Sequence, residues 1–262
     1  MSTVTPTAEH QRRQAEQSDA VYAKGPRAHV VSRDPLVRYL VDWRLKTAMD
    51  RLRRAAGDRL HPGSRVVVMC SGEGLEGTLL CDMGFTDVTV ADISPMAIEQ
   101  AVRRDPRLTG MVLDMDHQTL PDGAYDLAVV QDGLHHLQDP VRGFTEMLRI
   151  STTAVVFLEP HNSLAGRIVG RTWEQHGDAV NYVFRWTRRL VQDVASSYLG
   201  RHSFRNLSFA FWHHNVMLAK IGKPLGTRVS VLVLRAAKTV LDRVLPASGN
   251  QFCGMIVKTP RT

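Results

Sequence analysis

The feature that most constrains the fold is a short apolar run that enters a cluster of glycines. Arg65-Val-Val-Val-Met-Cys70 is followed at once by Gly72-x-Gly74-x-x-Gly77. An apolar run of this length is typical of a parallel strand that is buried on both faces. Glycines directly after such a strand allow a tight turn and a close approach of another molecule to the backbone. The segment predicts a buried strand, a ligand-accessible loop and then a helix.

Further apolar runs alternate with helical patterns through the middle of the chain. The expected strands lie at 88–91, 110–113, 127–130 and 154–158, and the expected helices at 75–83, 96–104 and 140–149. Strands that alternate with helices of this length predict βαβ units and a parallel sheet. Right-handed crossovers then place the functional loops at the carboxyl ends of the strands.

The two ends of the chain show other patterns. Residues 1–57 predict a polar arm and a lid helix that begins after Pro35 and stops at Gly57. Residues 58–262 form the predicted main domain, with an insertion near 160–187. Beyond the insertion the expected elements are helices at 187–199 and 227–244 and strands at 203–209 and 252–257.

An acidic residue stands where a nucleoside cofactor needs one. Asp92 ends the second predicted strand, twenty residues after Gly72. A carboxylate at that position accepts hydrogen bonds from both hydroxyls of a ribose. The glycine spacing also fits the dinucleotide fingerprint, so a NAD-dependent oxidoreductase is one alternative. Asp114 favours a different nucleoside, because it offers a polar group to an adenine edge at the end of the third strand.

Three ordered motifs resemble those of class I S-adenosylmethionine-dependent methyltransferases. The run Leu120-Pro … Tyr125-Asp-Leu-Ala-Val-Val … Leu134-His-His-Leu-Gln-Asp-Pro140 is similar to their fourth-strand motif. Val90-Ala-Asp-Ile-Ser-Pro-Met-Ala-Ile98 resembles the second-strand motif, and Glu146-Met-Leu-Arg149 resembles the helix before the fifth strand. The resemblance implies an α/β three-layer sandwich with an N-terminal helical lid. Its seven-stranded sheet would be mostly parallel, with 252–257 as an antiparallel last strand.

The resemblance also implies S-adenosylmethionine as the cofactor. In that family the glycine loop approaches the amino-acid part of the cofactor, and the acid after the second strand holds the ribose. Residues after the third strand flank the adenine, and those after the fourth line the methionine side. The residues at these positions, in the same order, are Cys70, Ser71, Gly72 and Gly74, then Asp92 and Ile93, then Asp114 and Met115, then Gln131 and Asp132.

The glycine loop departs from the family pattern in two places. Cys70 stands where the family usually has an acid, and Glu76 stands where a third glycine is common. A thiol does not accept a hydrogen bond from the cofactor ammonium as a carboxylate does. Glu73 or Asp132 would serve instead, and Cys70 is expected to be a buried, unreactive residue at the strand end.

Histidines gather after the fourth and fifth predicted strands. His135 and His136 follow the fourth strand, and His161 follows the fifth. Histidine titrates near neutral pH, so these three are the candidate general bases for a hydroxyl acceptor. With Glu159 they could also ligate a metal. No close-set ligand pattern supports that alternative, and no metal is expected.

Aromatic and basic residues between 160 and 190 indicate an acceptor site. An aromatic wall suits a flat or apolar substrate, and arginines there would pair with its carboxylate or phosphate. The lid would contribute further aromatic contacts. The expected substrate contacts are Tyr22, Tyr39, Trp43, Trp173, Tyr182, Arg185 and Trp186.

The helix predicted at 227–244 is amphipathic. Its apolar positions include Val229, Val233 and Val240, opposed by arginines and a lysine. Interfacial membrane helices have this pattern, but helices that pack on a core have it more often. We therefore expect core packing here and no membrane association.

Composition narrows the class of protein further. The 262 residues carry 33 basic and 26 acidic side chains, a net charge of +7, and most of the basic residues are arginines without the clustering of a nucleic-acid site. Three cysteines do not make a disulfide scaffold, and the N-terminus lacks a secretory pattern, so a cytoplasmic protein is expected.

The predicted activity is methyl transfer to a small molecule, first to a hydroxyl oxygen and otherwise to nitrogen or carbon, as in natural-product biosynthesis. A cofactor-binding scaffold without catalysis and a homodimer are left open, and no nucleic-acid partner is expected.

Overall fold

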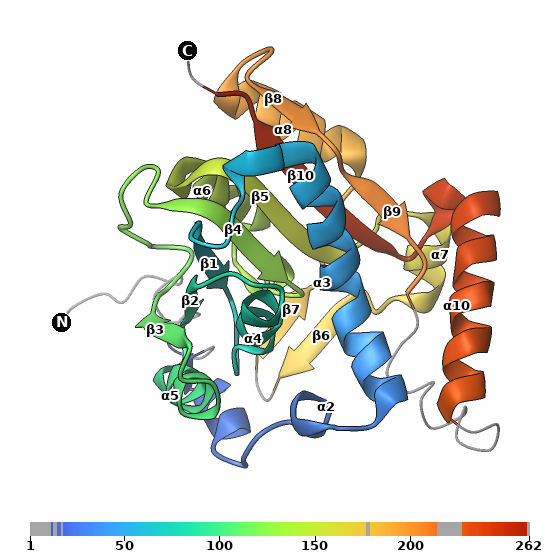
Figure 1. Cartoon of the computed structure of the whole chain (residues 1–262), viewed down its shortest axis with the longest axis horizontal. Helices are drawn as coiled ribbons and strands as arrows, with labels where there is room; N and C mark the ends of the chain where they lie inside the picture. Colours follow the sequence, from blue (N-terminus) through green and yellow to red (C-terminus); the bar gives the residue numbers. More distant parts are fainter. Residues whose placement is uncertain (1–11, 13–14, 17, 177–178, 214–226, 261–262) are drawn as a thin grey trace.

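The computed structural model describes residues 12, 15–16, 18–176, 179–213 and 227–260. One large sheet, in the order β3-β2-β1-β4-β5-β10-β8, crosses the molecule (Figure 1). The first five strands run parallel, and β10 pairs antiparallel with β5. The strands of this sheet are β1 Arg65–Met69, β2 Asp87–Asp92, β3 Leu108–Val112, β4 Tyr125–Gln131, β5 Ser151–Pro160, β8 Phe204–Asn206, β9 Phe209–Phe211 and β10 Gln251–Lys258. The predicted fold class and the antiparallel last strand are confirmed.

The outer position of the sheet differs from the single strand expected at 203–209. Two short strands, β8 and β9, both pair with β10 there. The Asn206 side chain accepts from the backbone N–H of Ser208, and the Ser208 hydroxyl accepts from Met255 N–H. These side-chain hydrogen bonds replace part of the backbone hydrogen bonding between strands, so the expected strand is broken into two. The sheet therefore has eight strands.

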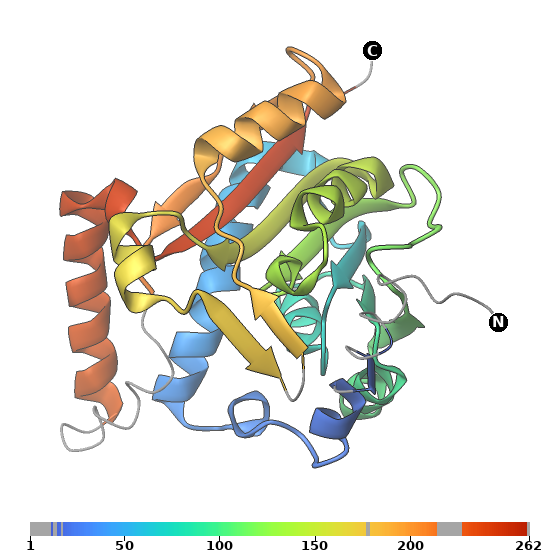
Figure 2. The same ribbon diagram turned by 180° about the vertical axis from the view of Figure 1, so that it is seen from behind.

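Helices cover both faces of the sheet and make the other two layers (Figures 1 and 2). On one face Val66 and Val68 of β1 join a cluster with Met49 of α3 and Leu80 of α4, while Val67 joins a second cluster on the other face with α6 and α8. Because successive side chains of a strand point to opposite faces, β1 contributes residues to the hydrophobic clusters on both faces of the sheet. The helices are α2 Ala28–Val31, α3 Pro35–Ala56, α4 Leu75–Asp82, α5 Pro95–Arg104, α6 Pro140–Ile150, α7 Leu164–Val169, α8 Arg188–Leu199 and α10 Thr227–Val244, with 3-10 turns η1 Gly57–Arg59, η2 Leu134–His136 and η4 Pro246–Ser248.

The segment between β5 and α8 contains α7 and a hairpin of two strands, β6 Trp173–His176 and β7 Ala179–Tyr182. The hairpin contacts η2, which follows β4, so it lies over the carboxyl end of the sheet. Residues 1–11, 13–14 and 17 of the predicted arm lie outside the described residues. Residues 18–27 of the arm and α2 lie along the same end of the sheet, below α5 and α4 in Figure 1.

Helix α10 packs only in part as expected. It lies against α3, where Val231 and Leu234 pack on Leu36 and Leu40. Val229, Val233 and Val240, the apolar positions named above, are exposed instead. Among the described residues, no helix has the length and apolar character needed to cross a membrane.

Candidate functional site

The glycine loop begins with backbone conformations that side chains rarely adopt. Cys70 has a φ of 51°, Gly72 of 49° and Gly74 of 70°. At the end of β4, Asp132 has a φ of 51° as well. Left-handed residues that carry a side chain cost free energy, and they concentrate at functional sites. The turns after β1 and β4 lie side by side because these two strands pair.

Asp92 organises the loop from the end of β2. Its Oδ2 accepts a hydrogen bond from Gly72 N–H at 2.7 Å, and its Oδ1 accepts from Ser94 N–H at 3.0 Å. Burial raises the pKa of this carboxyl, and the two N–H donors oppose the rise. Each oxygen can accept a further hydrogen bond, so the carboxylate could also hold two hydroxyls.

Several buried polar atoms around this loop have no hydrogen-bond partner among the described residues. They include Ser71 Oγ after β1, Gln131 Oε1 at the end of β4 and Arg44 Nε on α3. Buried polar atoms in proteins are nearly always paired. Orphaned atoms that gather at the ends of two adjacent strands therefore indicate a place for a polar ligand.

The residues after β3 reach the same loop. Met115 is buried, and its sulfur lies 3.7 Å from Cys70 Sγ. Asp114 accepts from the N–H of Asp116 and interacts with the ring of His117. Burial raises the pKa of the Cys70 thiol well above its usual value, and so it stays protonated and unreactive. Ile93 is half-buried next to Asp92.

The N-terminal arm closes over the glycine loop. Tyr22 is buried, and its hydroxyl lies 2.6 Å from the point where a Cβ on Gly72 would stand. Arg27 N–H donates to Glu73 Oε1, and Asp19 pairs with the Ser94 hydroxyl. Burial raises the pKa of Tyr22 to about 12. Tyr22 thus faces the predicted cofactor loop in this structure, whereas the sequence led us to expect it at the acceptor.

Arg44 is a site residue that sequence reasoning missed. Its guanidinium forms a two-pronged ion pair with Asp132, with one N···O distance of 2.9 Å. Burial would raise the pKa of Asp132, but Arg44 outweighs it and lowers that pKa. The sequence did contain a sign of this role, because Arg44 is a charged residue on the apolar side of the predicted helix. It lies one helical turn from both Leu40 and Ala48, which are buried in α3.

Glu159 at the end of β5 binds the turn after β4. The carboxylate is fully buried and accepts from Gly133 N–H at 2.8 Å and from Leu134 N–H at 2.7 Å. Its second oxygen lies 2.6 Å from His135 Nδ1, while His135 Nε2 lies 3.4 Å from Glu174 of the hairpin. Burial opposes protonation of His135, but Glu159 outweighs burial and raises the pKa to about 10.

His135, His136 and Glu174 also form a set of possible metal ligands, with their ligand atoms within 4.8 Å of one another. The protonated His135 itself supplies a positive charge at this place, because it lies between the carboxylates of Glu159 and Glu174, where a metal ion would otherwise supply it. The proton on His135 also makes it a poor general base at neutral pH.

The pKa of His135 predicts how stability depends on pH. Its folded value, about 10, lies above the unfolded value of 6.5, so the contribution is complete below pH 6.5 and is lost as pH rises through 10. We expect the free energy of unfolding, measured by urea titration, to decline between pH 7 and 10. In His135→Gln this part of the decline should disappear. An equally steep decline in the variant would assign it to other groups.

The remaining predicted residues lie in three places. His161 is buried, interacts through Nδ1 with Gly249 O at 2.8 Å, and stacks on Phe252, and burial lowers its pKa. Trp173 and Tyr182 form an exposed edge-to-face pair on the hairpin. Arg185 donates to backbone carbonyls at the base of the hairpin, including that of Arg171.

Trp186 does not lie on a pocket wall. It is fully buried among Phe144, Phe157 and Phe184. This position gives it a packing role in the core below the hairpin, and a substrate could not reach it in this structure.

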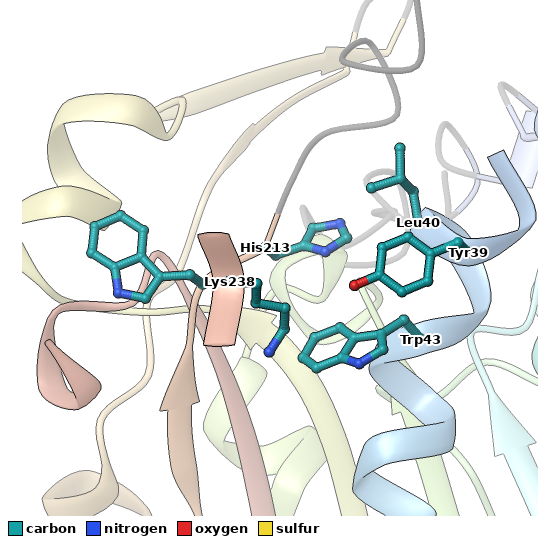
Figure 3. A pocket seen from close by; sticks show the side chains of 6 residues that line it. Tyr39, Leu40, Trp43, His213 and Lys238 are labelled. Carbon is teal, nitrogen blue, oxygen red and sulfur yellow. The ribbon is translucent and has the colours of Figure 1, made fainter. Parts of the chain in front are cut away.

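Tyr39 and Trp43, which were expected to contact the acceptor, face α10. Their rings face Lys238 and His213 across a small hollow that Leu40 also lines (Figure 3). The Lys238 ammonium lies 3.5 Å from the centre of the Trp43 ring and pairs with Asp242. Burial lowers the pKa of Lys238. The lid aromatics therefore hold α3 and α10 together.

Known proteins resemble this chain in sequence. Residues 68–156 match the methyltransferase domain family. A demethylmenaquinone methyltransferase of Beutenbergia cavernae is 36% identical over 110 residues, which cover 41% of this chain and 45% of that protein. The enzyme of the same name from Renibacterium salmoninarum is 28% identical over 90 residues, covering 34% and 38%. The chain thus spans less than half the length of these curated relatives.

Solved structures agree in fold. Magnesium protoporphyrin IX methyltransferase of Synechocystis PCC 6803, solved with bound S-adenosylmethionine, is 11% identical to this chain. The match has a TM-score of 0.56 and covers 98% of this chain and 100% of that one. The matched domain, the motifs and the sheet order confirm the resemblance seen in the sequence. The methyltransferase domain of this chain at residues 68–156, its motifs and its sheet order are those of the class I S-adenosylmethionine-dependent methyltransferases.

Proposed function

We propose that this protein transfers a methyl group from S-adenosylmethionine to a small hydroxylated aromatic molecule. The observation that carries the proposal is the unsatisfied polar cradle at the ends of β1 and β4, where Ser71 Oγ and Gln131 Oε1 are buried without partners. It lies beside Asp92, at the strand ends where α/β sheets bind their ligands.

The residues of the cradle suit the parts of this cofactor. Asp92 would accept from the ribose hydroxyls, and Asp114 with Met115 would flank the adenine. Glu73 is buried next to Gly72 and supplies the carboxylate that Cys70 lacks, so it would pair with the cofactor ammonium. When bound, S-adenosylmethionine supplies an electrophilic methyl group. The protein has to hold the acceptor in line with that group and to exclude water.

The acceptor side is formed by η2 and the hairpin. Trp173 and Tyr182 offer exposed aromatic rings on a hairpin that contacts η2. Rings of this kind stack on flat substrates. The relatives named above are demethylmenaquinone methyltransferases, and that name supports an aromatic acceptor. Because a phenolate is nucleophilic at its oxygen and at adjacent ring carbons, the acceptor could receive the methyl group on either atom.

His136 or His161 would remove the proton from the acceptor hydroxyl. His135 is held as a cation by Glu159. The interaction of His161 Nδ1 with a carbonyl oxygen requires a proton on Nδ1, which leaves Nε2 as an acceptor. Burial lowers the pKa of His161 and keeps it neutral. His136 is half-buried beside His135, with ring centroids 4.2 Å apart.

Calorimetry with S-adenosylmethionine and its demethylated product tests the proposal. We expect binding of both, and no binding of NADH. Incubation with labelled S-adenosylmethionine and a panel of quinols and phenols should then give a methylated product, whose position mass spectrometry and NMR identify. Cofactor binding without turnover on any acceptor would favour a scaffold, and failure to bind the cofactor would refute the proposal. Single His136→Gln and His161→Gln variants rank the two bases by kcat.

A further inference from the structure

The outward face of α10 carries more apolar surface than a helix exposed to water needs. We define the outer face as Val229, Leu232, Val233, Ala236, Val240 and Val244, which recur every three or four residues on one side of the helix. Its valines and leucine are 51 to 69% exposed. The opposite side packs against α3 with Val231 and Leu234, together with Ser230 and Lys238. An amphipathic helix normally buries its apolar positions, whereas α10 leaves these six outer positions exposed.

Neighbouring elements extend the outer face. Helix α7 is joined to the C-terminal end of α10 through η4, since the Ser163 hydroxyl donates to Gly249 O at 2.8 Å. Leu164 and Ile168 of α7 are 75 and 73% exposed. Figures 1 and 2 show α10 at the edge of the molecule with α7 beside it. Apolar side chains are therefore exposed on two helices at the same edge of the molecule, away from the glycine loop.

The charges around these apolar side chains are of one sign. Arg228, Arg235 and Arg243 are exposed on α10, where Arg235 also lies over the Tyr39 ring of α3, and Arg167 is exposed on α7. Within residues 227–250 the only acidic side chain is Asp242, and it pairs with Lys238. A second copy of the chain would bring arginines against arginines without acids to balance them.

We propose that the outer face of α10, with α7, docks the protein on an anionic lipid surface. The valines and leucines enter the boundary between headgroups and acyl chains while the arginines pair with lipid phosphates. The docking departs from the expectation that the protein does not associate with a membrane, while the inward side of α10 packs on α3 as expected. It does not depend on the proposed methyl transfer, because none of these residues belongs to the cofactor cradle.

Co-sedimentation of the full chain with vesicles tests the docking. With phosphatidylglycerol–phosphatidylcholine vesicles we expect binding that weakens as salt is added, and at least about tenfold weaker binding to pure phosphatidylcholine. Val233→Asp/Val240→Asp should lower binding about tenfold or more, and Arg228→Ser/Arg243→Ser should lower it only on anionic vesicles. Ser197→Asp/Tyr198→Asp on α8 adds the same charge on another surface and should bind like the unaltered protein.

Circular dichroism and calorimetry with S-adenosylmethionine should show that both α10 variants remain folded and keep cofactor affinity. Three outcomes would overturn the proposal: no binding of the unaltered chain to anionic vesicles, equal binding to neutral vesicles, or equal loss in the α8 variant. Light scattering adds a fourth. A dimer that Val233→Asp/Val240→Asp dissociates would make the outer face a subunit interface.

Discussion

Replacement of Asp92 by alanine should remove most of the affinity for S-adenosylmethionine. The carboxylate would lose its charge-assisted hydrogen bonds to the ribose, each contributing about 1.5–3 kcal/mol, so the affinity should fall by about tenfold to 150-fold for one bond and further for two. The glycine loop would also lose the acceptor for Gly72 N–H. Isothermal titration calorimetry with the cofactor and its demethylated product measures both losses together.

One further variant separates the two roles of Asp92, which are holding the ribose and holding Gly72 N–H, and a second variant is the control. Asp92→Asn keeps one oxygen that can accept from Gly72 N–H, but it loses the negative charge, and its affinity should lie between those of the other two proteins. Asp87→Ala, at the exposed start of the same strand, removes a carboxylate without touching the loop and should bind normally. Unchanged affinity in Asp92→Ala would show that the cofactor is held elsewhere.

The sequence was sufficient for the five parallel strands of the sheet because their signals are local. The apolar runs at 65–70 and 127–130 and the glycines after the first of them mark strands and turns within a few residues. Asp92 was found for the same reason, since its position follows from a strand end and a fixed spacing. Trp186 was misjudged because an aromatic residue near a predicted site can equally well fill the core, and its neighbours Phe144 and Phe157 come from distant segments.

Charged residues that act through long-range contacts were harder to find. The partner of Asp132 is Arg44, 88 residues away, and no local pattern joins the two. Glu174 meets His135 only because the hairpin folds back over η2. For α10 the periodicity gave the helix and its apolar face but not the direction of that face. Orientation is set by the contacts that the other side makes with α3, in this case Lys238 over the Trp43 ring, and Val231 and Leu234 against Leu36 and Leu40.

The largest loss of stability is expected from Glu159→Ala. This carboxylate is fully buried and holds two backbone N–H groups and the His135 cation. Removing one partner of a buried ion pair costs about 3–5 kcal/mol, because the remaining charge stays buried without a counterion. The free energy of unfolding from urea titration at pH 7 should fall by about this amount. Glu99→Ala on the exposed side of α5 is the matched control and should stay within about 0.5 kcal/mol of the unaltered protein.

A double variant shows how much of this loss comes from the stranded cation. In Glu159→Gln the amide oxygen can still accept from a backbone N–H, while His135 loses its counterion and its pKa should drop, as the NMR titration of the ring would report. Adding His135→Gln removes the buried charge, so Glu159→Gln/His135→Gln should be more stable than Glu159→Gln alone. If the second substitution lowers stability further, the ion pair does not dominate, and the two N–H bonds to Gly133 and Leu134 carry the effect. Because these bonds set the turn that carries both histidines, Glu159 would then act on catalysis by positioning that turn.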